Sequence, residues 1–175
     1  MLSKFKKNAI PSSIADKFGG VETKDGLHIA KNGRIRTYKK CYNGKEGICY
    51  AYDHLYWFNE EGYEIQPPLN VGGNFDCSNC SNLKSLEGAP KTVGESFYCD
   101  HCQYLTSIEG APHKVGGNFD CCRCSNLKSL EGAPLNVGGS LYCYDCQSLT
   151  SLEGAPQKIG VEFVCSNTKI SSLQK

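Results

Sequence analysis

The chain has 175 residues, of which 39% are hydrophobic and 21% are charged, and its formal net charge is +1. This composition is typical of a folded, soluble protein with one domain, or one domain and a small companion, and excludes a disordered chain. No apolar run approaches the ~20 residues that span a bilayer. The basic N-terminus lacks the apolar segment of a secretory signal. We therefore expect a cytoplasmic protein that does not associate with membranes.

The charges are distributed unevenly along the chain. Residues 1–45 hold eleven Lys and Arg against three Asp and Glu, whereas residues 46–67 hold five acidic residues and no basic ones. A basic segment is usually a solvated surface, but it keeps nucleic-acid binding through this region as an alternative function.

Residues 1–67 do not repeat, and their pattern predicts a short helix followed by hairpins. Residues 11–18 carry a helix-start signal and the glycines at 19–20 a stop. The Asn-Gly turn at 31–33, flanked by residues 27–30 and 34–38, predicts a hairpin. A second strand pair is predicted at 47–52 and 54–58, leading into 63–65.

We expect residues 1–67 to form a small mixed N-terminal cap, because repeat proteins need their open ends covered. The segment is rich in aromatic residues, which are more often core than binding site. They are Tyr50, Tyr52, Tyr56, Trp57, Phe58 and Tyr63.

From residue 68 onward the sequence repeats with a period of 22 residues. Full copies occupy 68–89, 90–111, 112–133 and 134–155, and a degenerate fifth copy follows to residue 175. The first and third copies resemble each other most, as do the second and fourth, which indicates duplication of a 44-residue unit. One such unit cannot bury its own apolar face, so stacked copies must share a continuous core.

Alternation of apolar and polar residues around the Phe-x-Cys segment predicts a short, half-buried strand in each copy. In the first copy we expect three side chains of this segment to point inward and three outward. The inward ones are Val71, Phe75 and Cys77, and the outward ones are Asn74, Asp76 and Ser78. As the chain coils back, Cys80, Leu83, Leu86 and Ala89 should also turn inward.

The repeats resemble leucine-rich repeats. The last copy matches part of that pattern as Phe163-x-Cys165-x-x-Thr168-x-Ile170-x-x-Leu173, and the recurring Ser-Leu-Glu-Gly-Ala-Pro and Val-Gly-Gly segments look like the short repeats of large tailed bacteriophages and some bacteria. The resemblance covers residues 68–175. It implies a mainly β or α+β solenoid with a parallel sheet on its concave face, but it does not specify a function.

The repeats contain four C-x-x-C pairs with eighteen residues between successive pairs, a spacing that also fits a zinc-binding template. The repeat offers a simpler interpretation, since both cysteines of each pair fall at inward positions and a reduced thiol is a small hydrophobe. The fifth copy replaces the second cysteine with Thr168. We therefore expect core cysteines and no cofactor, and keep zinc or disulfides as alternatives. The pairs are Cys77/Cys80, Cys99/Cys102, Cys121/Cys124 and Cys143/Cys146.

Cys122 breaks the pattern at an outward position. It is either a tolerated substitution or a reactive thiol on a binding face. The sequence has no spacing that identifies a nucleophilic triad, so we expect no catalytic residues and no enzyme activity.

The outward residues of the predicted sheet form the candidate binding face. Tyrosines are good interface anchors, and the acidic groups beside them favour a basic or mixed protein surface over a phosphate backbone. A merely solvated face is the alternative. The candidate binding residues are Asp76, Tyr98, Asp100, His101, Asp120, Cys122, Arg123, Tyr142 and Tyr144.

These features predict a non-catalytic module that binds another protein. The resemblance to phage repeats implies a viral protein that binds and inhibits a host factor, such as a defence protein, in the host cytoplasm. The last repeat has no visible cap, and it is either exposed or paired with a second copy of the chain.

Overall fold

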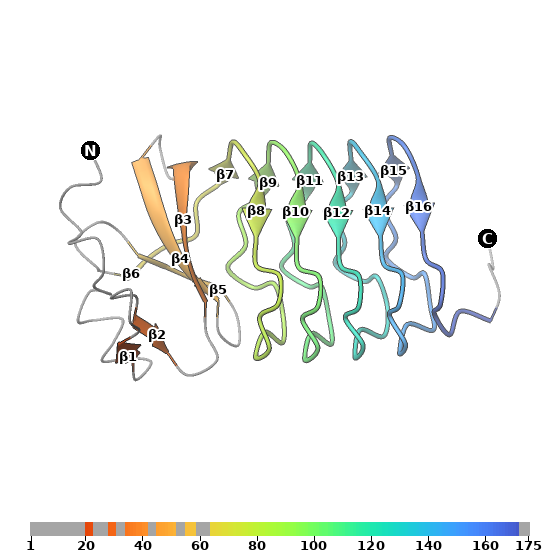
Figure 1. Ribbon diagram of the computed structural model, residues 1–175. Helices are drawn as coiled ribbons and strands as arrows, with labels where there is room; N and C mark the ends of the chain where they lie inside the picture. Colours follow the sequence, from red (N-terminus) through yellow and green to blue (C-terminus); the bar gives the residue numbers. More distant parts are fainter. Residues whose placement is uncertain are drawn as a thin grey trace.

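The computed structural model describes residues 20–22, 28–30, 34–41, 45–51, 55–58 and 64–171 (Figure 1). Before residue 66, side chains are described only for Cys49 and for residues 55–57. Across these ranges the secondary structure consists of strands and turns, without a helix. The helix predicted at residues 11–18 lies outside the described residues, as does most of the basic segment.

The first part of the chain forms antiparallel sheets. One sheet pairs β1 with β2, and the other has the order β3-β4-β5-β6. The strands predicted at 47–52 and 54–58 are confirmed, since β4 pairs with β5 in antiparallel register. The hairpin predicted across residues 31–33 is wrong, because the strand before this turn pairs with β1 and the strand after it pairs with β4. The bounds are β1 Gly20–Glu22, β2 His28–Ala30, β3 Arg34–Cys41, β4 Lys45–Ala51, β5 Leu55–Phe58 and β6 Glu64–Ile65.

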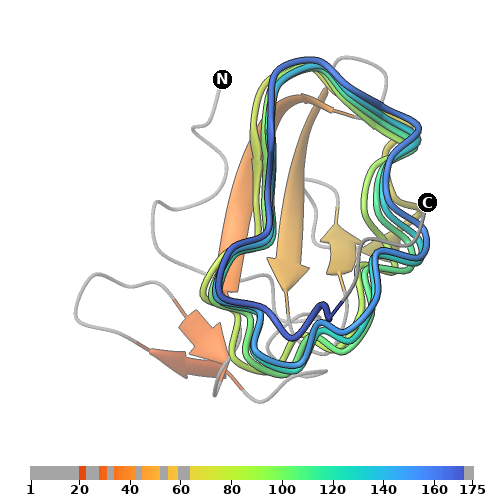
Figure 2. The same cartoon turned by 90° about the vertical axis from the view of Figure 1, so that its right-hand side faces the viewer.

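From residue 68 the chain forms a stack of similar coils, each contributing two short strands (Figures 1 and 2). The strands form two five-stranded parallel sheets that run along the stack. One sheet contains β8 Phe75–Asp76, β10 Phe97–Tyr98, β12 Phe119–Asp120, β14 Leu141–Tyr142 and β16 Phe163–Val164. The other contains β7 Asn70–Val71, β9 Thr92–Val93, β11 Lys114–Val115, β13 Asn136–Val137 and β15 Lys158–Ile159.

The solenoid expected from the repeat is thus confirmed as a parallel β-solenoid, but two details differ from the expectation. The two residues before each glycine bend, such as Asn70–Val71, form a second sheet that we did not predict. The coils also stack along a nearly straight axis in both views, so the sheet of β8 to β16 is not a strongly concave surface (Figures 1 and 2).

Equivalent side chains of successive coils form columns inside the stack. The inward positions predicted for the first copy are all buried. The same positions are buried in the next three copies, except that Ala133, Leu152 and Ala155 are only partly buried. Phe75, Phe97 and Phe119 stack with ring centroids 5.0 and 5.3 Å apart. In the last described coil the apolar side chains are only partly buried, and Val161 is 74% exposed. Pairing of this coil with a second copy stays a prediction.

Strand β5 contacts the first coil directly. The Leu55 amide donates to the carbonyl of Glu87 at 2.9 Å, and Trp57 Nε1 donates to the carbonyl of Gly88 at 2.7 Å. The Trp57 ring lies 6.0 Å from that of Phe75, so it extends the phenylalanine column by one ring. These contacts hold the first coil against the preceding sheet.

Candidate functional site

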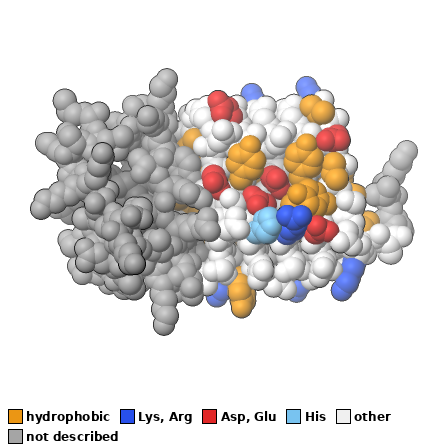
Figure 3. Space-filling model, viewed as in Figure 1, with side chains coloured by type: hydrophobic (Ala, Val, Ile, Leu, Met, Phe, Trp, Pro, Cys, Tyr) orange, Lys and Arg blue, Asp and Glu red, His pale blue; other side chains and the backbone are white. Residues whose placement is uncertain are grey.

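The candidate site lies on the outer surface of the sheet formed by β8, β10, β12, β14 and β16. Acidic side chains, a histidine, an arginine and several groups of the hydrophobic class, which includes tyrosine, gather on this face (Figure 3). Eight of the nine predicted binding residues are partly or fully exposed here. They are Asp76, Tyr98, Asp100, His101, Asp120, Arg123, Tyr142 and Tyr144.

Asp and Tyr alternate along the middle row of this face. Asp76 pairs in register with Tyr98, Tyr98 with Asp120, and Asp120 with Tyr142. Adjacent strands of a sheet lie about 4.8 Å apart. The alternation therefore places the two carboxylates about 9.6 Å from each other with an aromatic ring between them, which limits like-charge repulsion.

The row before the phenylalanines joins the coils together. Asn74 Oδ1 accepts from the Ser96 amide at 2.9 Å, Ser96 Oγ from the Asn118 amide at 3.0 Å, and Asn118 Oδ1 from the Ser140 amide at 2.8 Å. These side chains satisfy backbone donors of the following coil. We assign this row to the scaffold.

Cys122 does not present an accessible thiol, so the reactive-thiol alternative is wrong. Its side chain is only 1% exposed, and its amide donates to Asp120 Oδ1 at 3.0 Å. Burial raises the pKa of the Cys122 thiol, and the hydrogen bond to Asp120 raises it further. Ser78, the equivalent residue of the first coil, is also buried and bonds to Asp76. In these two coils the aspartate binds the amide two residues on, and the side chain of that residue is turned away from solvent.

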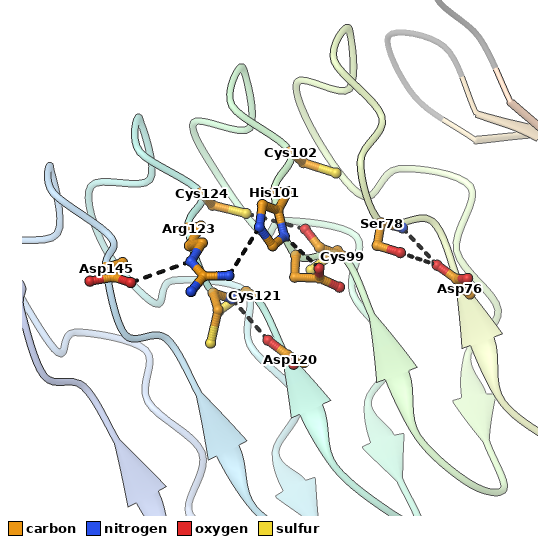
Figure 4. Close-up of polar contacts among 12 residues, drawn as sticks. Asp76, Ser78, Cys99, His101, Cys102, Asp120, Cys121, Arg123, Cys124 and Asp145 are labelled. Carbon is orange, nitrogen blue, oxygen red and sulfur yellow. Dashed lines mark hydrogen bonds and ion pairs between the residues drawn. The ribbon is translucent and has the colours of Figure 1, made fainter.

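A chain of polar contacts crosses three consecutive coils at the rim of the face (Figure 4). His101 Nδ1 lies 2.7 Å from Asp100 Oδ2, and His101 Nε2 lies 3.2 Å from Arg123 Nη1. Because guanidinium only donates, this geometry places Nε2 as the acceptor from Arg123 and Nδ1 as the donor to Asp100. Arg123 Nε donates to Asp145 Oδ2 at 3.4 Å.

Two further contacts position the rim residues. The Arg123 guanidinium lies 5.5 Å from the centroid of the Tyr144 ring, a cation–π geometry. Asn167 Nδ2 donates to the carboxylate of Asp145. Arg123 is therefore held by three neighbours while half of its side chain stays exposed.

The rim residues occupy a strained backbone position. His101, Arg123 and Asp145 have φ values of 56–58°, and the equivalent Asn79 and Asn167 have 55°. This left-handed region is uncommon for residues other than Gly, and Asn, Asp and His adopt it more readily than Arg does, so Arg123 is the least favoured of the three. Three consecutive coils thus carry charged or titratable side chains where the outer coils carry the locally favoured Asn.

The C-x-x-C pairs lie in the core, as predicted, with both cysteines of every pair buried. The second cysteine of a coil donates its thiol proton to a backbone carbonyl of the preceding coil. Sγ of Cys102, Cys124 and Cys146 lies 3.2 Å from the carbonyl oxygen of Cys77, Cys99 and Cys121, respectively.

Zinc ligation would require thiolates. Burial instead raises the pKa of the Cys77 and Cys99 thiols well above its ordinary value. Within the part of the chain that the structure describes, no three His, Cys, Asp or Glu side chains are grouped as ligands for a metal ion. The cysteines described in the repeats therefore fit a structural role.

The site also includes two residues that were not among the predicted binding residues. Asp145 completes the rim chain, and Glu162 accepts from the Tyr142 hydroxyl at 3.1 Å. Their place on the outward face followed from the repeat, but their contacts depend on side chains one coil away, which no local pattern contains.

Comparisons with known proteins find no match among protein-family models, curated proteins or solved structures. A search for membrane-spanning helices, confined to the described residues, also finds none. The geometry of the sheet face is therefore the basis for inferring function.

Proposed function

We propose that this protein is a non-catalytic module that binds a partner protein through the outer face of the β8 to β16 sheet. The observation that carries the proposal is that Tyr98 and Tyr142 lie in one in-register row, with the Tyr144 and Arg123 contact in the turns beside it. Tyrosine and arginine are the residue types that dominate binding energy in protein interfaces.

The arrangement of the rim supports binding because it is ordered before a partner arrives. Arg123 is fixed by His101, Asp145 and the Tyr144 ring. Immobilising a free side chain on binding costs about 0.5–1.5 kcal/mol, and this cost falls when the side chain is already held. An exposed yet ordered arginine is suited to a hot spot.

The charges of the face favour a basic or mixed partner surface. Its carboxylates are Asp76, Asp100, Asp120, Asp145 and Glu162, whereas Arg123 is its permanently positive group. Complementary charge accelerates encounter with a basic protein and disfavours a nucleic-acid backbone. Nucleic-acid binding would need the basic first 45 residues instead.

The resemblance of the repeats to those of tailed bacteriophages supports a more specific role. On that basis we propose a viral protein that acts in the host cytoplasm by blocking a host protein, such as an antiviral defence factor.

The test combines a triple substitution with affinity capture. We expect immobilised wild-type protein to retain specific proteins from a bacterial lysate, identified by mass spectrometry, because the tyrosines provide the buried contact area. Tyr98→Ala with Tyr142→Ala and Tyr144→Ala should lose them and keep the wild-type circular dichroism spectrum.

Tyr104→Ala is the matched control, since Tyr104 is 58% exposed but lies outside the strands of this sheet. Equal retention by the wild type and the folded triple variant would contradict the proposed face.

A further inference from the structure

The outer face of the β8 to β16 sheet has a regular axial period. Its strands are in register, so Asp76, Tyr98, Asp120 and Tyr142 lie in one row along the nearly straight stack (Figure 1). With about 4.8 Å per strand, each residue type recurs about every 9.6 Å. A ligand lying along this row meets a ring and a carboxylate in each such interval.

This row is acidic, and the positive charges of the solenoid lie mainly elsewhere. Lys114 and Lys158 lie in the other sheet, and Lys84 and Lys128 are exposed in the irregular segments that follow the cysteine pairs. Arg123 is already bound to Asp145. A ligand that follows the row is therefore stabilised by positive side chains.

The period distinguishes between backbone conformations of a bound segment. A polyproline II helix rises about 3.1 Å per residue with three residues per turn, so equivalent side chains recur about every 9.3 Å. Same-side residues of a β-strand recur about every 6.7 Å. Two turns of an α-helix span about 10.8 Å. The polyproline II repeat is the closest to the 9.6 Å interval.

We infer that the partner presents a basic, proline-rich segment in the polyproline II conformation, lying along the solenoid axis with Arg or Lys at every third position. The inference rests on the proposed function and specifies its partner. The basic side chains lie against Asp76 and Asp120, and the pyrrolidine rings pack on Tyr98 and Tyr142. Aromatic-lined surfaces recognise such preformed helices at low entropic cost.

Synthetic peptides test the inference directly. One peptide contains four Arg-Pro-Pro triplets, a second has the same composition with all arginines at one end, and a third replaces Arg by Glu. Binding to the full chain is measured by fluorescence anisotropy at physiological salt. We expect the periodic peptide to bind at least about tenfold more tightly than the clustered one, and the Glu peptide not to bind.

Variants connect binding to the row. Tyr98→Ala with Tyr142→Ala should weaken binding of the periodic peptide by about tenfold or more, and Tyr104→Ala should not. Asp120→Asn keeps an oxygen that accepts from the Cys122 amide and removes the charge, so it should weaken binding with unchanged thermal stability.

Equal affinity for the periodic and clustered peptides, or full affinity in the folded tyrosine variant, would overturn the inference. A different result would contradict the proposed function itself, namely that the triple tyrosine variant still captures the proteins that the wild type retains. A partner that depends on the tyrosines while both arginine peptides fail to bind would leave the function standing and reject the polyproline segment.

Discussion

At the scale of single residues, cysteine thiols connect consecutive coils through hydrogen bonds. The thiols of Cys102, Cys124 and Cys146 each donate to a backbone carbonyl of the preceding coil. An unpaired buried carbonyl is costly, and a thiol is small and apolar enough to satisfy it within a packed core. The regular spacing of the cysteines therefore reflects the fold.

Buried thiols should make the protein sensitive to alkali. Burial raises the pKa of Cys77, Cys99 and Cys143 above its ordinary value. A raised folded-state pKa contributes stability that is present below the unfolded pKa of about 8.5 and is lost as pH rises above it. We expect urea midpoints to be level from pH 6 to about 8 and to fall from about 9 upward.

Cys146 opposes this trend, because a hydrogen bond from Cys121 lowers its pKa. The thiols with raised pKa outnumber it, so the net slope stays negative. Cys143→Ala removes one of these thiols and should make the alkaline decline shallower. An unchanged decline in this variant would mean that Cys143 does not contribute to it.

Residue-level alternation predicted the buried side of each strand but misplaced Cys122 and Ser78. The strands β8 and β12 end at Asp76 and Asp120, whose carboxylates bind the amide two residues on. These turns, followed by a left-handed residue, break the period of two. Alternation therefore predicts which side chains are buried only where the backbone is extended.

At the scale of elements, the coils approach so closely that some glycines have no room for a side chain. A Cβ on Gly116 would overlap the carbonyl oxygen of Gly94 in the preceding coil, and Gly138 has the same relation to Gly116. Gly72 occupies the equivalent position in the first coil, where nothing lies within 4 Å.

This difference predicts opposite outcomes for the same substitution. Gly116→Ala should destabilise the protein by about 1–3 kcal/mol, because a backbone oxygen must move to relieve the overlap. Gly72→Ala should change the free energy of unfolding by less than about 0.5 kcal/mol. Urea denaturation of both variants provides the measurement. Equal losses would show that coil spacing is not what selects glycine here.

Pairing between elements was harder to predict than their position. The Asn-Gly signal at 31–33 located a break between two strands, but β2 pairs with β1 and β3 with β4. A turn motif specifies where the chain changes direction, whereas strand partners depend on tertiary packing. The sheet of β7 to β15 escaped prediction because each of its two-residue strands is followed directly by glycine, a residue that predicts a turn.

At the scale of the whole molecule, one column of aromatic rings connects the two parts of the chain. It runs from Trp57 through Phe75 and Phe97 to Phe119. In repeat proteins each unit is stabilised mainly by its neighbours. The first coil has the solenoid on one side only, so we propose that β5 serves as its cap.

Substitutions of Trp57 test this capping role. Trp57→Ala removes the ring beside Phe75 and the hydrogen bond to Gly88, and should lower the free energy of unfolding by about 3–5 kcal/mol. Trp57→Phe keeps an aromatic ring and loses the hydrogen bond, so it should cost about 1 kcal/mol from that bond. Hydrogen exchange locates the effect. We expect the Phe75 amide, which donates to Ser96, to lose protection before the Cys143 amide, which donates to Val164. Unchanged protection of Phe75 in Trp57→Ala would contradict a cap at β5.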